Sequence, residues 1–139
     1  MYLVDTSVWV DYLAGRNQRH VAFLDDLLSN PVAVGLCDLI YMELLQGARD
    51  VRGFTRLRSY LDGQRFYRFA DATQSHADAA RIYFECRRKG VTVRSAVDCL
   101  IAQCAIDNGA ILLHNDRDFS NLAKVVKNLR EKSFWQPSN

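Results

Sequence analysis

The sequence has no long apolar run and none of the cysteine or histidine patterns that mark membrane, disulfide-rich or zinc-binding proteins. Charged residues interrupt each apolar stretch well before the roughly 20 residues that a bilayer-spanning helix needs. The four cysteines form no Cys-x-x-Cys pair, and the three histidines are scattered along the chain. We therefore expect no membrane association, no zinc centre and no disulfide framework. The cysteines are interpreted as buried free thiols: Cys37, Cys86, Cys99 and Cys104.

The N-terminal segment also lacks the basic start of a secretion signal. Met1-Tyr2-Leu3-Val4-Asp5 reaches an acid at once, so a cytoplasmic location is the expectation. The 139 residues are 49% hydrophobic and 24% charged, which is typical of one globular domain. No repeat, linker or low-complexity segment divides them. We predict a single domain over residues 1–139.

Basic residues are unevenly distributed, although the net charge is only +2. They gather in residues 49–68, 87–94 and 124–132. Such groups can form a surface for the backbone of a polyanion. They can equally form solvated helix faces, and the sequence alone leaves both interpretations open.

Apolar runs alternate with segments of helical periodicity. The predicted strands are residues 2–4, 32–34, 66–69 and 110–113, with a weak final strand. The predicted helices are residues 6–13, 21–28, 39–46, 54–61, 96–107 and 120–126, and a long one from Thr73 to near Gly90. Asp38, Thr73 and Ser95 are the candidate N-caps. This alternation predicts an α/β domain with a mainly parallel sheet, covered by helices on both faces.

Two acids directly follow predicted buried strands. Asp5 comes after residues 2–4, and Asp116 comes shortly after residues 110–113. In open parallel sheets, ligands bind outside the carboxyl ends of the strands, which makes both acids candidates for a site. Aspartate is also a common helix cap, so each position has that alternative.

Two more acids stand in otherwise apolar helices. Glu43 is the only charge in residues 39–45, and Asp98 lies in the apolar stretch 96–106. Because an isolated buried charge is costly, a buried carboxylate needs partners. Glu43 could instead occupy a narrow exposed stripe. Asp98 could form a capping box with Ser95, a role that is compatible with a place in a site.

The four acids together predict a cation site. Grouped carboxylates repel one another, and a cation relieves that repulsion. Oxygen ligands suit hard ions such as Mg²⁺ or Mn²⁺. An ion held in this way can activate water and neutralise charge on a phosphodiester, with no cysteine or histidine nucleophile. The pattern therefore favours metal-dependent cleavage of a nucleic acid.

Four blocks in order along nearly the whole chain resemble the PIN-domain nuclease superfamily, and within it the VapC toxins of bacterial toxin–antitoxin pairs. The blocks are Leu3-Val4-Asp5-Thr6-Ser7-Val8, Glu43-Leu44-Leu45-Gln46-Gly47, Asp98-Cys99-Leu100-Ile101-Ala102 and Leu112-Leu113-His114-Asn115-Asp116-Arg117-Asp118-Phe119. The resemblance implies a PIN-like domain with a parallel sheet of about five strands. It also implies a catalytic set of Asp5, Glu43, Asp98 and Asp116, in which the three aspartates ligate or orient Mg²⁺, with Mn²⁺ as the alternative.

The resemblance assigns supporting roles to neighbouring residues. Thr6 would order the site through its hydroxyl. Asp118 would be a second acid of the last block, or would only cap the following helix. His114 departs from the family, which usually has threonine or serine there; it could donate a hydrogen bond to a carboxylate or to substrate phosphate. The candidate RNA- or antitoxin-binding residues are Arg49, Arg52, Arg56, Arg94 and Arg117.

The resemblance further implies an endoribonuclease toxin that cuts structured RNA, often transfer RNA. Such a toxin would form a homodimer and a hetero-oligomer with a VapB-like antitoxin that inhibits it. Two alternatives remain within the family: a housekeeping PIN nuclease for RNA processing, and a PIN domain that binds RNA or a partner without cutting. A receiver-like signalling domain is disfavoured because Asp5 is followed by Thr6 and no lysine follows Leu113. A haloacid-dehalogenase-type phosphatase would need aspartate in place of Ser7.

Overall fold

The computed structural model describes residues 1–137 and contains a fully parallel sheet of five strands. The strand order is β3-β2-β1-β4-β5, so the first strand is central. The strands are β1 (Tyr2–Val4), β2 (Val34–Leu36), β3 (Arg65–Phe66), β4 (Ile111–His114) and β5 (Glu131–Ser133). In the central pair, Leu3 lies opposite Leu112 and Val4 opposite Leu113. The predicted parallel sheet is confirmed.

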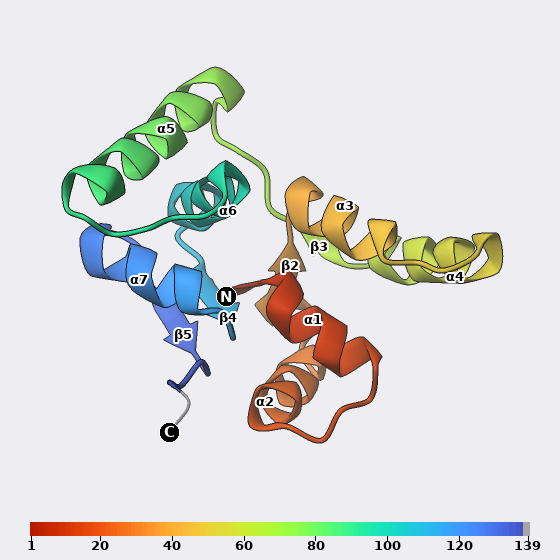
Figure 1. Cartoon of the computed structure of the whole chain (residues 1–139). Helices are drawn as coiled ribbons and strands as arrows, with labels where there is room; N and C mark the ends of the chain where they lie inside the picture. The colour runs from red at the N-terminus through yellow and green to blue at the C-terminus, as the bar shows by residue number, and fades with distance from the viewer. Residues whose placement is uncertain (138–139) are drawn as a thin grey trace.

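Helices cover both faces of this sheet, also as predicted. α1 and α2 lie on one side, and α5, α6 and α7 lie on the other (Figure 1). Because both faces are covered, the central strands are apolar throughout, and Leu3, Val4, Leu112 and Leu113 are fully buried. The helices are α1 (Thr6–Leu13), α2 (Arg19–Leu28), α3 (Asp38–Gln46), α4 (Val51–Asp62), α5 (Ala72–Arg88), α6 (Ala96–Asp107) and α7 (Arg117–Val125).

Several boundaries differ from the sequence predictions. The second strand begins at Val34, because Pro31 opens a short 3-10 turn, η1 (Pro31–Ala33), that occupies most of the predicted segment. The third strand is only Arg65–Phe66. Five helices begin earlier than expected: α2, α3, α4, α5 and α7. Upstream aspartates cap the last three of them: Asp50 for α4, Asp71 for α5 and Asp116 for α7. Asp38 does not cap α3 but is its first residue.

The interpretation of the cysteines as buried free thiols is confirmed. All four cysteines are free and buried. Among residues 1–137, no helix has both the length and the apolar character needed to cross a membrane.

Candidate metal-dependent active site

The carboxyl ends of β1 and β4 bring Asp5 and Asp116 to the same edge of the sheet. These strands are direct neighbours, and the backbone N–H of Asp5 donates to Leu113 O at 2.9 Å. Each strand then turns straight into a helix whose N-cap is the aspartate. Asp5 Oδ2 accepts from the Ser7 backbone N–H at 3.0 Å, and Asp116 Oδ1 accepts from that of Asp118 at 2.8 Å. Asp5 and Asp116 therefore each cap a helix and also lie together at the site.

Asp5 is the most deeply buried of the four acids, with only 4% of its surface exposed. This burial raises the pKa of its carboxyl, and the nearby charge of Asp116 adds to the rise; the hydrogen bond from Ser7 opposes it. The protein thus holds this carboxylate where its charged form is disfavoured. Such an arrangement is typical of sites that bind a cation or react.

α3 directs Glu43 to the same site. Its carboxylate is half-buried, and Oε1 accepts a hydrogen bond from Thr6 Oγ1 at 3.1 Å. Burial raises the pKa of Glu43, and the charges of Asp5 and Asp116 raise it further. Glu43 is therefore not on a solvated stripe, and the Thr6 hydroxyl has the ordering contact expected of it.

α6 contributes Asp98 from its first turn. Burial, followed by the charges of Asp5 and Asp116, raises the pKa of Asp98 to about 7. Asp118 and Glu43 contribute further repulsion. The Ser95 hydroxyl caps α6 by accepting from the Val97 N–H at 3.1 Å. Within residues 1–137, no hydrogen bond joins the Asp98 carboxylate to Ser95, so the capping box is not formed and the carboxylate is left to the acidic group.

The four acids form one electrostatic unit, here called the acidic pocket: Asp5, Glu43, Asp98 and Asp116. Its chemistry fits a hard divalent cation, because its ligands are oxygens and their mutual repulsion needs a positive charge. In residues 1–137, no group of three or more histidine, cysteine, aspartate or glutamate side chains stands ready to hold a metal ion. Mg²⁺ characteristically uses only one or two carboxylates, with water and phosphate oxygens as the other ligands, so the donor set still suits it.

Ser7 joins the two strand ends, a role that the sequence interpretation did not identify. Its hydroxyl oxygen accepts a hydrogen bond from the Asn115 backbone N–H at 2.9 Å. This bond fixes the segment that carries Asp116 against the start of α1. Its place directly after Asp5-Thr6 was the only available signal, since the partner lies in the last block of the sequence.

His114 is the last residue of β4 and belongs to the interior of the protein. Its side chain is fully buried. Nδ1 accepts from the Asp116 backbone N–H at 3.2 Å, so Nε2 carries the proton and donates to Glu131 Oε2 at 2.5 Å. The expected hydrogen bond to a carboxylate exists, but with Glu131 and not with one of the four acids. A contact with substrate phosphate is excluded by its burial.

Asp118 does not cap α7, because Asp116 does. Asp118 is instead 9% exposed and lies 3.6 Å from the guanidinium of Arg94, measured from Oδ1 to Nε. Arg94, Arg117 and Lys124 line a cavity of about 470 Å³ that includes Asp118. Two of the predicted basic residues, Arg94 and Arg117, therefore lie beside the acidic pocket.

The other predicted arginines belong to a different region. Arg52 and Arg56 are exposed on α4, and Arg49 lies in the turn before it. α4 packs against α3 and extends away from the sheet (Figure 1). Among residues 1–137, no ion pair joins these arginines to any of the four acids.

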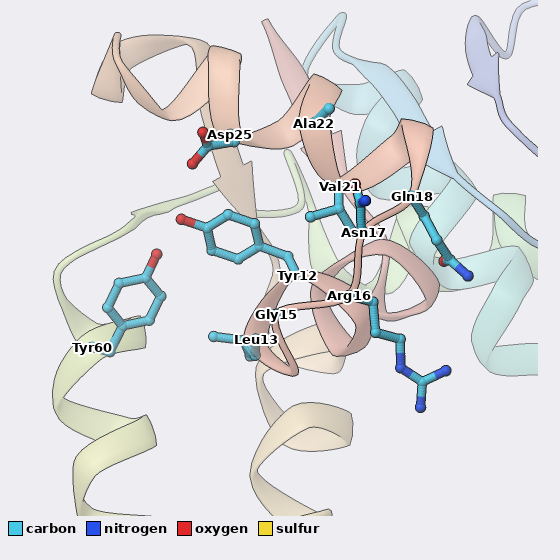
Figure 2. Close-up of a pocket in the computed structure, with 10 residues that line it drawn as sticks. All are labelled: Tyr12, Leu13, Gly15, Arg16, Asn17, Gln18, Val21, Ala22, Asp25 and Tyr60. Atoms are coloured by element: carbon cyan, nitrogen blue, oxygen red, sulfur yellow. The ribbon is translucent and has the colours of Figure 1, made fainter.

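A further cavity of about 480 Å³ lies between α1, α2 and the end of α4 (Figure 2). We call it the tyrosine cavity, because the hydroxyl ends of Tyr12 and Tyr60 gather there beside the carboxylate of Asp25. Leu13 and Val21 add apolar surface. None of the four acids lines it.

Comparison with known proteins identifies the family. The family model described as "PIN domain" matches residues 2–125. The chain belongs to the PIN-domain family. A VapC ribonuclease of Mycobacterium bovis is 41% identical to this PIN domain over 135 residues, which are 96% of this chain and 99% of that one. Ribonuclease VapC11 of Mycobacterium tuberculosis has the same identity and coverage.

Solved structures share the fold at lower identity. VapBC2 from Rickettsia felis, bound to a DNA fragment from its promoter, has a TM-score of 0.74 at 20% identity, and the match covers 96% of this chain and 98% of that one. FitAB bound to a DNA fragment has a TM-score of 0.72 at 20% identity over 100% and 99% of the two chains. The predicted PIN-like fold is confirmed.

Proposed function

We propose that this PIN domain is a metal-dependent endoribonuclease toxin of the VapC type. The observation that carries the proposal is the acidic pocket, in which burial and mutual repulsion raise the pKa of Asp5, Glu43 and Asp98. The identity of 41% to proteins named VapC ribonucleases supports the same activity.

The proposed cofactor is Mg²⁺, with Mn²⁺ as the alternative. Asp5, Asp98 and Asp116 would ligate or orient it, one or two of them directly and the rest through water. The strand ends and the first turn of α6 carry these three aspartates, which supports the assignment. When bound, such an ion supplies activation of water and neutralisation of charge on the phosphodiester. The Ser7 and Asp118 backbone N–H groups fix the Asp5 and Asp116 carboxylates before any ion arrives.

Glu43 is the proposed proton acceptor. In hydrolysis, the water oxygen would form a bond to phosphorus and give its proton to Glu43. The bond between phosphorus and the leaving oxygen would break, and the leaving oxygen would take a proton from solvent. The raised pKa of Glu43 lets its carboxylate hold a proton at a pH closer to neutrality than an ordinary glutamate. Thr6 fixes the acceptor by donating to Oε1.

The substrate is proposed to be structured RNA, whose negatively charged phosphates would meet Arg94 and Arg117 beside the acidic pocket. Arg49, Arg52 and Arg56 on the α4 side are proposed to lie on the path of the RNA or of an antitoxin. Transfer RNA is the substrate we would test first.

The proposed partners are a VapB-like antitoxin and a second copy of this chain. Large apolar side chains are exposed on α1, α3 and α4, and such surfaces mark sites of protein association. Leu13 and Tyr60, which are among them, line the tyrosine cavity and are 41% and 39% exposed. We propose this cavity as part of the antitoxin interface. The protein would then act in the cytoplasm, where both RNA and antitoxin are found.

The decisive experiment compares cleavage of purified transfer RNA by the wild type and by Asp5→Asn. Wild type should cut with Mg²⁺ or Mn²⁺ and stop with a chelator, whereas Asp5→Asn should lose at least about 100-fold in rate, because it weakens both ion binding and charge balance. The exposed Asp26→Asn is the matched control and should retain full activity. Cleavage that persists in Asp5→Asn or in chelator would refute the proposal.

A further inference from the structure

Another cavity opens at the carboxyl edge of the sheet, near the end of β5. β5 ends at Ser133, and the Phe134 backbone N–H donates to His114 O at 3.0 Å. The backbone N–H of Trp135 then donates to Ser133 Oγ at 3.2 Å. These bonds place Phe134 and Trp135 beside the end of β4. Asp116 follows that strand in the chain.

The cavity has a volume of about 420 Å³, within the usual range of small-ligand sites. The lining side chains that matter here are Gln18, Arg19, Asn115, Phe134, Trp135 and Gln136. Asn115 directly precedes Asp116 in the chain, so the lining of this cavity continues into one of the four acids. A ligand bound there would lie next to the reacting phosphate.

The two aromatic residues are held differently. Phe134 packs on the core through Phe23, with ring centroids 5.4 Å apart, and the Arg19 guanidinium lies 5.7 Å from its ring centroid. Trp135 is half-buried, and in residues 1–137 no aromatic ring stacks on it. Phe134 thus anchors the segment, while the indole of Trp135 is presented to the cavity.

Three amide side chains also line the cavity: Gln18, Asn115 and Gln136. The remaining lining residue, His20, is buried and forms a hydrogen bond with Asp11. Among residues 1–137, none of these side-chain amides has a hydrogen-bond partner within the protein. Each therefore offers donors and an acceptor to a ligand. No acidic side chain lines this cavity, and Arg19 supplies positive charge.

We propose that this cavity binds one unstacked nucleobase of the RNA substrate and contributes to the choice of cleavage site; the inference rests on the proposed ribonuclease function. Sequence-specific recognition of RNA uses bases in single-stranded loops, which stack on aromatic side chains and hydrogen-bond through their edges. Trp135 supplies the stacking surface, and the three amides supply hydrogen bonds to the base edge. Arg19 lies where it can meet a flanking phosphate.

The test measures RNA binding in an Asp5→Asn background, so that cleavage does not remove the probe. The probes are labelled RNA hairpins whose loops contain a single base type: adenine, cytosine or uracil. Fluorescence anisotropy should show that Trp135→Ala weakens binding of the preferred loop about tenfold or more, whereas Trp135→Phe retains most of the affinity. Asn115→Ala should reduce the preference between loops. Phe84→Ala, which removes an exposed aromatic on α5, is the matched control and should change nothing.

Unchanged affinity in Trp135→Ala, or an equal loss in Trp135→Ala and Phe84→Ala, would overturn the proposal, as would no binding to any hairpin. Loss of antitoxin binding with RNA affinity intact would also overturn it, because the occupant would then be a peptide. Circular dichroism of each variant confirms folding. In the otherwise wild-type protein, Trp135→Ala should also redistribute the cut sites. If hairpins bind through Trp135 but the wild type never cuts RNA, the ribonuclease function fails while the base cavity stands.

Discussion

The acidic pocket and the tyrosine cavity are two regions of the same domain with different physical character. The pocket concentrates like charges at the sheet edge, where burial raises the pKa of Asp5 and brings that of Asp98 to about 7. The tyrosine cavity has apolar and hydroxyl-bearing walls, with Leu13 and Tyr60 open to solvent. The first arrangement lowers stability until a cation binds. The second leaves apolar surface in water until a protein covers it.

The largest predicted effect comes from Asp98→Asn, which removes one charge from the acidic pocket. Cleavage should fall at least about 100-fold, because a ligand of the proposed ion is lost. The free energy of unfolding should rise instead of falling. The raised pKa means that the folded protein holds a proton on Asp98 when the unfolded chain has released it, so stability falls as pH rises from about 4 to about 7. Without divalent cations, Asp98→Asn should therefore be more stable than wild type at pH 8, by about 1 kcal/mol after allowance for solvent screening.

Thermal unfolding at pH 5 and pH 8, with and without Mg²⁺, checks this prediction. The difference between Asp98→Asn and wild type should shrink at pH 5, and Mg²⁺ should stabilise the wild type more than the variant. Asp26→Asn serves again as the control. A variant that is less stable than wild type at both pH values would mean that Asp98 is a structural residue and not a strained member of the pocket.

The second prediction concerns the tyrosine cavity. Tyr60→Ala should weaken inhibition by the cognate antitoxin about tenfold or more, because partly exposed aromatic residues of this kind dominate protein interfaces. Cleavage by the free protein should be unchanged, since none of the four acids of the acidic pocket lines this cavity. The measurement is the antitoxin concentration that halves the rate of RNA cleavage. Tyr83→Ala on α5 is the matched control; an equal effect of both variants would remove the cavity from the interface.

The acidic pocket and the tyrosine cavity also differ in how well the sequence predicts them. The acidic pocket could be predicted because strand ends and lone charges in apolar helices are local signals, and parallel strands bring their ends together. α6 was predicted with its observed bounds, since Ser95 begins it and Asn108-Gly109 ends it. The tyrosine cavity was not predicted, because Tyr60 meets α1 and α2 only through the packing of α4.

Other differences have the same origin in long-range contacts. The ion pair of Arg94 with Asp118, and the bond from His114 to Glu131, join residues whose partners no local pattern indicates. The second strand was misplaced because an apolar run next to Pro31 fits a strand and a 3-10 turn equally well. Strand β3, with two residues, is too short to carry a periodic signal.

The smallest predicted effect tests how the pocket is held together, and Ser7→Ala provides it. The variant loses the hydrogen bond from the Asn115 N–H to Ser7 Oγ and should unfold with about 1 kcal/mol less free energy. Because this bond positions the segment of Asp116 and does not touch substrate, kcat should fall by less than about tenfold while KM stays unchanged. Ser7→Thr should recover most of the loss, and the exposed Ser29→Ala should have no effect on kcat. If Ser7→Ala unfolds like the wild type and retains its kcat, the two strand ends are aligned by the sheet alone. The same pair of measurements on Tyr60→Ala should leave kcat unaltered, because none of the four acids lines the tyrosine cavity.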